Sequence, residues 1–217
     1  MSLLGNAALA MWWDMSPDMN CEFEHWHSHE HFPERLGIPG FRRGSRWSSA
    51  TGGEGTFVMY ELQDYGVLSS PGYLARLNAP TPWSRKMMPH HRNMVRCQCH
   101  VVETRGGGVA RHALTIRLSP AAGREDELRT SLRLIIAKIA GRPGLAGAHL
   151  LKHETPAIAQ TVEQEIRGAG DQVGDWILVV CGHDRTALEA LAQHEVAPGQ
   201  VSGLYSLSHS AVPADFC

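Results

Sequence analysis

The 217-residue sequence lacks an excess of charge of either sign. It contains 20 Lys and Arg against 22 Asp and Glu, which gives a formal net charge of -2, and no run of basic residues stands out. Because binding to a phosphate backbone requires clustered positive charge, we do not expect nucleic acid as a partner.

Long apolar runs and a cysteine framework are also missing. No uninterrupted apolar stretch is long enough to span a bilayer, and the first residues, MSLLGNAALAMWWDM, have no positively charged start typical of a signal peptide. The five cysteines are scattered, and Cys97 and Cys99 are too close for a Cys-x-x-Cys metal motif. These absences predict a cytoplasmic protein with free thiols and no membrane association.

The sequence contains one structural pattern written twice. Gly37-Ile38-Pro39-Gly40-Phe41 is matched by Gly141-Arg142-Pro143-Gly144-Leu145, each after a helical pattern and before a strand pattern. In the first half we expect strands at 7–15, 40–47, 56–64 and 94–103 and helices at 23–36 and 70–78. In the second half we expect strands at 111–119, 144–153, 175–184 and 199–210 and helices at 125–140 and 186–194. Each half is therefore a predicted βαββαβ unit, which is the ferredoxin-like arrangement.

Two such units in one chain can lay the uncovered faces of their sheets together. The predicted fold class is α+β, with two tandem ferredoxin-like βαββαβ repeats forming an intrachain α+β barrel and the helices outside. We assign residues 1–104 to a first repeat that holds the pocket, 105–110 to a Gly-rich linker, and 111–217 to a second repeat that is mainly scaffold. The segments 79–92 and 154–174 interrupt the regular spacing and are candidate lids or interface.

Four histidines alternate with other residues in EHWHSHEHFPERLGIPGF, residues 24–41. On a helix, His27 and His31 share one face, and His25 and His29 share another. Pro33 fits poorly inside a helix, so we expect the helix to end or kink near His31.

A histidine pair at this spacing can chelate zinc, nickel or copper. A third ligand would have to come from Asp14, His90, His91 or His100, and the segment does not contain His-Glu-x-x-His. We therefore predict no metal and no cofactor.

The stretch WHSHEHFPERLGIPGFRRGSRW, residues 26–47, resembles the EthD-like branch of the dimeric α+β barrel superfamily. In that branch a helix carries an aromatic-x-x-x-Glu-His-x-Pro pattern and leads into a Pro-Gly-Phe strand. Residues 73–96 also resemble its second-helix region, whereas the second half lacks the Glu-His motif. The superfamily includes cofactor-free monooxygenases, cyclases, dehydratases, muconolactone isomerases and haem-binding enzymes. The resemblance therefore implies a small hydrophobic pocket and leaves the reaction open.

Histidine acid–base chemistry is the prediction that this segment favours, because imidazole titrates near neutrality. His31 lies at the Glu-His position of the resemblance and is the predicted main acid or base, with His27 one turn earlier as the second candidate. A carboxylate from Glu30, Glu34 or Asp14 would orient the imidazole, and we take Glu30 and Asp14 as catalytic candidates. The alternative is that His31 only braces the helix.

Aromatic residues crowd into the first half, which predicts a pocket for a ring-bearing substrate or simply a packed core. Arginines on neighbouring strands could clamp an anionic or phenolic group. The predicted substrate-binding residues are Trp13, Trp26, Arg43, Tyr60, Trp83, Arg96 and His100.

We thus predict a cofactor-independent lyase, isomerase or dehydratase that acts by histidine acid–base catalysis on a small aromatic or hydrophobic molecule. An oxygenase, either haem-bound or cofactor-free, is one alternative, and a non-catalytic small-molecule-binding protein is another. The edges and helices of such barrels also allow a homodimer.

Overall fold

The computed structural model describes residues 3–52, 54–139, 141–168, 172–195 and 200–216. The strands of the first half are β1 (Ala7–Met15), β2 (Phe41–Ser49), β3 (Gly55–Leu62) and β4 (His91–Gly106). Those of the second half are β5 (His112–Leu118), β6 (Leu145–His153), β7 (Trp176–Gly182) and β8 (Val201–Ala211). Residues 140 and 199, at the ends of an expected helix and strand, lie outside the described ranges.

The strands form a closed antiparallel barrel in the order β1-β3-β2-β8-β5-β7-β6-β4. The first four strands pair as β4-β1-β3-β2 and the last four as β6-β7-β5-β8, which is the ferredoxin-like order in both halves. The halves join through β2 with β8 and β4 with β6. The predicted fold class of tandem ferredoxin-like repeats closing an intrachain barrel is confirmed.

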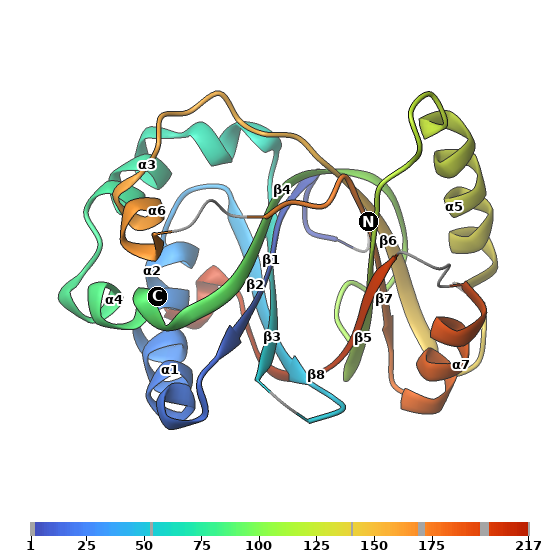
Figure 1. The fold of residues 1–217 in the computed structure, drawn as a ribbon, viewed down its shortest axis with the longest axis horizontal. Coiled ribbons are helices and arrows are strands. Elements are labelled where there is room, and N and C mark those ends of the chain that lie inside the picture. Colours follow the sequence, from blue (N-terminus) through green and yellow to red (C-terminus); the bar gives the residue numbers. More distant parts are fainter. Residues whose placement is uncertain (1–2, 53, 140, 169–171, 196–199, 217) are drawn as a thin grey trace.

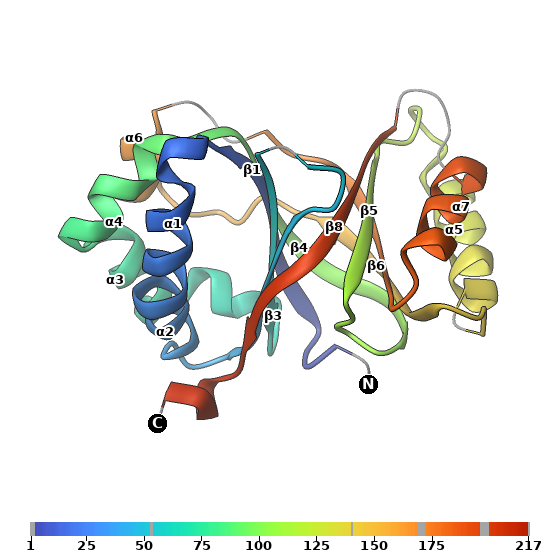
Figure 2. The same ribbon diagram turned by 90° about the horizontal axis from the view of Figure 1, so that it is seen from below.

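The helices lie outside the barrel in two groups on opposite sides (Figures 1 and 2). One group comprises α1 (Asn20–Trp26), α2 (Phe32–Leu36), α3 (Pro71–Asn78), α4 (Pro82–Met87) and α6 (Val162–Arg167). The other comprises α5 (Glu125–Ile139) and α7 (Arg185–Glu195). Thus α6, although it belongs to the second half of the sequence, lies with the helices of the first. None of the described helices has the length and apolarity to cross a bilayer.

Strand alternation divides the core into an interior and two outer layers. In β1, Ala8, Ala10 and Trp12 point into the barrel, where Trp12 stacks on Phe57 at 5.0 Å between ring centroids. The odd-numbered residues of β1 point toward α1 and α2 instead. This parity decides which side chains of the first half can reach a pocket under the helices.

The regular α-helix is interrupted near His31, where the sequence predicted an end or a kink, but helical structure continues through Pro33. Helical structure is continuous from Asn20 to Leu36. Within it, residues His27–His31 form a π-helical turn that joins α1 to α2. The Phe32 amide donates to the His27 carbonyl, five residues back, and Pro33 occupies the first turn of α2. A proline is tolerated there because its missing N–H is not required, and the wider turn takes up the break in the α-helical ladder.

The glycines assigned to the linker 105–110 have a role in strand pairing. β4 continues through Arg105 and Gly106, and Gly106, at φ 71°, pairs with Gly147 of β6. A Cβ on Gly106 would lie 2.2 Å from the Ala146 carbonyl oxygen, so the two backbones approach more closely than other residues allow.

Candidate active site

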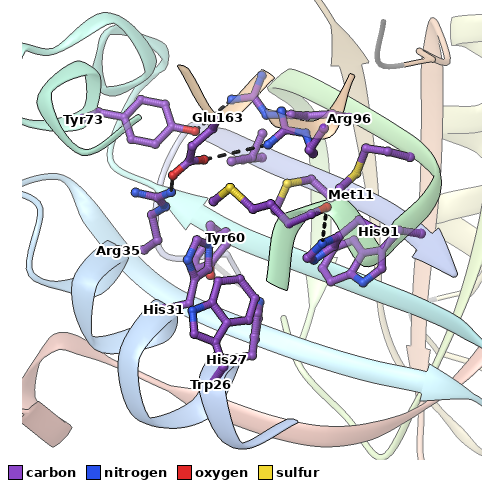
Figure 3. A pocket seen from close by; sticks show the side chains of 15 residues that line it. Met11, Trp26, His27, His31, Arg35, Tyr60, Tyr73, His91, Arg96 and Glu163 are labelled. Atoms are coloured by element: carbon purple, nitrogen blue, oxygen red, sulfur yellow. Dashed lines mark hydrogen bonds and ion pairs between the residues drawn. The ribbon is translucent and has the colours of Figure 1, made fainter. Parts of the chain in front are cut away.

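A small pocket lies between the sheet of the first half and the helices that cover it (Figure 3). Its free volume of about 40 Å³ is enough for a water molecule but too small for a ring-bearing molecule. Its walls come from three strands, from the helical segments that cover them and from α6. The lining residues are Leu9, Met11, Trp13, Trp26, His27, His31, Arg35, Tyr60, Tyr73, Met88, His91, Met94, Arg96, Glu163 and Arg167.

The π-helical turn aims His27 and His31 into this pocket. Their ring centroids are 5.3 Å apart, and His31 lies 4.6 Å from the Trp26 ring. Neither Nδ1 atom has a hydrogen-bond partner among the described residues. Both residues are buried, with His27 1% and His31 8% exposed. Burial lowers the pKa of both rings well below 6.5. The neighbouring His31 lowers the pKa of His27 further, and the Arg35 guanidinium lowers that of His31 further. Both imidazoles are therefore neutral at pH 7.

A glycine lets the helical turn approach the sheet this closely. A Cβ on Gly44 of β2 would lie 2.1 Å from Phe32 Cε1 and 2.9 Å from Tyr60 Cε1. Any larger residue at this position would push α2 away from the sheet.

His91, at the start of β4, is the third histidine of the pocket. Its Nδ1 lies 3.1 Å from the Met88 carbonyl oxygen, which favours the tautomer with the proton on Nδ1 and the lone pair on Nε2. The His91 ring lies tilted against the Trp13 ring, with 5.0 Å between the ring centroids. Burial lowers the pKa of His91 to about 4, against a small opposing effect of the hydrogen bond to Met88. The sequence pointed to His91 only as a possible metal ligand.

Glu34 is the carboxylate next to the catalytic candidate His31. Its Oε2 lies 3.9 Å from His31 Nδ1, and 3.7 Å from Arg35 Nη1. Burial raises the pKa of Glu34, while Arg35 opposes this effect. A proton taken up by His31 would be stabilised by this carboxylate.

Charged and phenolic groups form the opposite end of the pocket. Arg35 makes a buried ion pair with Glu163, 128 residues further along the chain. Burial alone would lower the pKa of Arg35, but Glu163 and Tyr73 raise it, so the guanidinium stays charged. Arg96 donates a hydrogen bond of 2.8 Å to the Tyr73 hydroxyl, whereas the buried Tyr60 hydroxyl has no partner among the described residues.

Of the predicted residues, the pocket brings together His27, His31, Trp13, Trp26, Tyr60 and Arg96. Glu30 does not line it. Its carboxylate accepts hydrogen bonds from Trp26 Nε1 at 3.1 Å and Thr81 Oγ1 at 2.6 Å. One residue before His31, Glu30 points around the helix toward α4, where it positions the Trp26 ring.

Asp14 and Arg43 are also outside the pocket, because strand parity turns them to the other face. Asp14 accepts a hydrogen bond of 2.8 Å from Asn93, and Arg43 pairs with Glu61 at 2.6 Å. On β1 the pocket is lined by Leu9, Met11 and Trp13, all odd-numbered.

Trp83 and His100 lie toward the outer surface. Trp83 Nε1 donates to Glu22 at 3.2 Å. His100 shares the face of Arg96 on β4 but lies four residues further along, where it stacks on Tyr65 at 4.2 Å and contacts Glu154.

Several residues that line the pocket were not predicted from the sequence. Arg35 could have been found, because it is four residues after His31 on the same helix. Met11 could also have been found from its alternation with Trp13. Glu163 and Arg167 lie in the segment 154–174, a candidate lid or interface, but no local pattern singled out these two residues, since only the tertiary fold brings α6 to this pocket. Among the described residues, no group of three or more His, Cys, Asp and Glu side chains is arranged to hold a metal ion.

No known family and no curated protein matches this sequence. Solved structures do match. An anthrone oxidase-like protein is 13% identical with a TM-score of 0.65, over 98% of this chain and 95% of its own. A monooxygenase candidate from Lactobacillus acidophilus is 7% identical with a TM-score of 0.60, over 96% and 97%. Another, from Fusobacterium nucleatum, is 8% identical with a TM-score of 0.59, over 97% and 96%.

At these identities the likeness extends to the fold alone. The chain shares the α+β barrel architecture built from ferredoxin-like units with these proteins. None of the three matches supports the EthD-like branch in particular.

Proposed function

We propose that the protein is an oxygenase that needs no cofactor and that removes a proton from a small aromatic substrate before the substrate reacts with dioxygen. The observation that carries the proposal is His31, a buried neutral imidazole with an unpartnered nitrogen, facing aromatic walls. A neutral imidazole can accept a proton, and an aromatic pocket suits a substrate whose anion is delocalised over a ring. Similarity of fold to proteins named as oxidase-like or monooxygenase candidates favours this class over the lyase or isomerase class.

The pocket residues supply a consistent set of roles. His31 would take the proton, with Glu34 stabilising the imidazolium and His27 as the second base on the same face. Arg35 would stabilise the oxyanion that develops on the substrate, since its Nη1 has no hydrogen-bond partner among the described residues. Trp13 and Trp26 would hold the ring.

The overall reaction would convert an activated CH2 group and dioxygen into a ketone and water. Loss of one proton to His31 leaves a carbanion, which transfers electrons to dioxygen and forms a carbon–oxygen bond. The resulting peroxide takes back the proton and then loses water, so that one oxygen atom stays on the product. Anthrone, which appears in the name of one structural neighbour, has such a CH2 group, and we take it as the first substrate to test.

The test compares His31→Gln with His29→Gln, an exposed position two residues earlier on the same helix. We expect His31→Gln to lower kcat/KM for anthrone by about 100-fold or more, the usual size of a general-base contribution, and His29→Gln to have no effect. Dioxygen uptake, and incorporation of one labelled oxygen atom into the product, are the measurements.

The outcomes separate the competing functions. Product formed without dioxygen would overturn the oxygenase proposal and support the lyase or isomerase reading, which shares the proton transfer. A Soret band in the purified protein would support the haem-bound alternative. Unchanged turnover in both His31→Gln and His27→Gln would remove histidine catalysis altogether.

A further inference from the structure

The helix α6 reaches from the second half of the chain into the pocket of the first. It contacts α3 and the turn before β4, and the Val162 amide donates to Asn78 Oδ1 at 3.2 Å. α6 has only six residues, and Glu163 is the only one of them that is fully buried. This helix is therefore attached mainly through a carboxylate, with little apolar burial (Figure 3).

Glu163 lies among guanidinium groups. Among the described residues that line the pocket, three are guanidinium groups, Arg35, Arg96 and Arg167, and one, Glu163, is a carboxylate. Glu34 lies behind His31 and is shared with Arg35 and the exposed Arg76. Glu163 forms an ion pair with Arg35 and lies 3.8 Å from Arg167, so buried guanidinium groups favour an anion at this position.

Arg35 shows where an anion would bind. The residue is 3% exposed, and its Nη2 bonds to Glu163 while Nη1 has no hydrogen-bond partner among the described residues. A guanidinium presents two parallel N–H groups that match both oxygens of a carboxylate. In this structure, Glu163 accepts a hydrogen bond from only one of these two nitrogens of Arg35.

We infer that the natural substrate carries a carboxylate in addition to its reacting ring, a group that the test substrate anthrone lacks, and that Glu163 occupies the carboxylate subsite on Arg35 when no substrate is bound. This inference rests on the proposed function, in which the pocket accepts an aromatic ring. The incoming carboxylate replaces Glu163, and α6 moves off the pocket. The pocket, which has a free volume of about 40 Å³ in this structure, then widens enough to hold the ring.

The exchange is physically reasonable because it replaces one carboxylate by another on the same guanidinium. Arg35 has a carboxylate partner before and after the exchange, so the net gain in free energy comes from burying the ring against Trp13 and Trp26. The cost is the release of α6, which is small because a six-residue helix with little apolar burial has low local stability.

The experiment measures binding of 2-naphthoate and of its neutral analogue 2-naphthamide to the full chain, by quenching of tryptophan fluorescence and by thermal shift. We expect the wild type to prefer 2-naphthoate. Glu163→Gln should bind 2-naphthoate about tenfold more tightly, because the competing charge is gone, with 2-naphthamide unchanged. The same variant should have a lower Tm, since Arg35 loses its partner, and 2-naphthoate but not 2-naphthamide should restore it.

The matched control is Glu165→Gln, an exposed residue on the same helix with the same change of charge. It should alter neither affinity. Equal binding of the two probes to Glu163→Gln, or equal tightening in Glu165→Gln, would overturn the inference. If Glu163→Gln does not fold, refolding with 2-naphthoate and not with 2-naphthamide is the expected result, and failure of that rescue would also overturn it.

Binding of these probes requires neither dioxygen nor His31. Loss of turnover in His31→Gln together with equal binding of both probes would therefore remove the carboxylate subsite alone. Selective binding of 2-naphthoate without turnover would instead remove only the oxygenase proposal.

Discussion

The two halves of the barrel have the same order of strands and helices, but they cover their sheets differently. In the second half, α5 and α7 pack on the sheet through an apolar layer that includes Leu132, Ile136, Ile139, Leu188 and Leu191. The first half also has an apolar layer, which includes Phe23, Phe32 and Leu36, but its helices enclose histidines, arginines and two tyrosines as well. The difference between the halves is this buried polar lining, on which the proposed function depends.

Two buried histidines illustrate the difference. His149 of β6 is fully buried, with Nδ1 2.8 Å from the Thr104 hydroxyl and Nε2 3.1 Å from the Gly107 carbonyl oxygen. His31 is nearly as buried, yet its Nδ1 is unpartnered. A buried polar atom normally has a partner, and one that lacks it costs stability. The partners of His149 indicate a structural role, whereas the unpartnered Nδ1 of His31 supports the proton transfer that we propose for it.

The largest expected effect is on the stability of the second half. Ile136 is 0% exposed in the middle of α5. Ile136→Ala should lower the free energy of unfolding by about 3 kcal/mol through lost burial and a cavity, with kcat/KM unchanged at temperatures where the variant is folded. Urea denaturation and turnover are the measurements, and a fall in kcat/KM of the folded variant would show that the packing of α5 influences the pocket.

Stability should also depend on pH because of the first half. The pKa of His91 is lowered to about 4, and those of His27 and His31 are also lowered. Between pH 6.5 and about 4, the unfolded chain binds protons that the folded protein does not, so stability is present above pH 6.5 and is lost as the pH falls. His91 alone accounts for about 3 kcal/mol at most.

Urea midpoints measured from pH 7.5 to 4.5 would test this dependence. His91→Phe should flatten the curve, whereas Ile136→Ala should shift it downward without changing its shape. An unchanged slope in His91→Phe would mean that other groups control the acid sensitivity.

Sequence patterns predicted the fold well because they report local periodicity. The alternation in β1 and the helical spacing of Leu132 and Ile136 each reflect a face that must be buried, and the repeated Pro-Gly turn revealed the duplication. His27 and His31 were placed on one face for the same reason.

The same reasoning failed where a residue's role depends on the tertiary fold. Glu30 was a reasonable catalytic candidate beside His31, but the direction of its side chain depends on the packing of α4. Arg43 was placed correctly on a strand, yet its parity turns it toward Glu61. Glu163 lies far away in sequence, and no local pattern could place it on Arg35.

The smallest expected effects are on the free energy of unfolding, and they have opposite signs at two tyrosines of the same pocket. The buried Tyr60 hydroxyl has no partner among the described residues, and the Tyr73 hydroxyl accepts a hydrogen bond from Arg96. Tyr60→Phe should raise the free energy of unfolding by about 1 kcal/mol because it removes an unsatisfied polar group. Tyr73→Phe should lower it by about 2 kcal/mol because it removes a hydrogen bond to a charged group.

Both variants are close in shape to the wild type, so urea denaturation compares the hydroxyl groups directly. A gain of stability in Tyr60→Phe accompanied by a rise in KM would show that the first half retains this unsatisfied hydroxyl for the substrate. Loss of stability in both variants would mean that the Tyr60 hydroxyl has a partner in solution, such as ordered water, and that the contrast between the halves is weaker at this position.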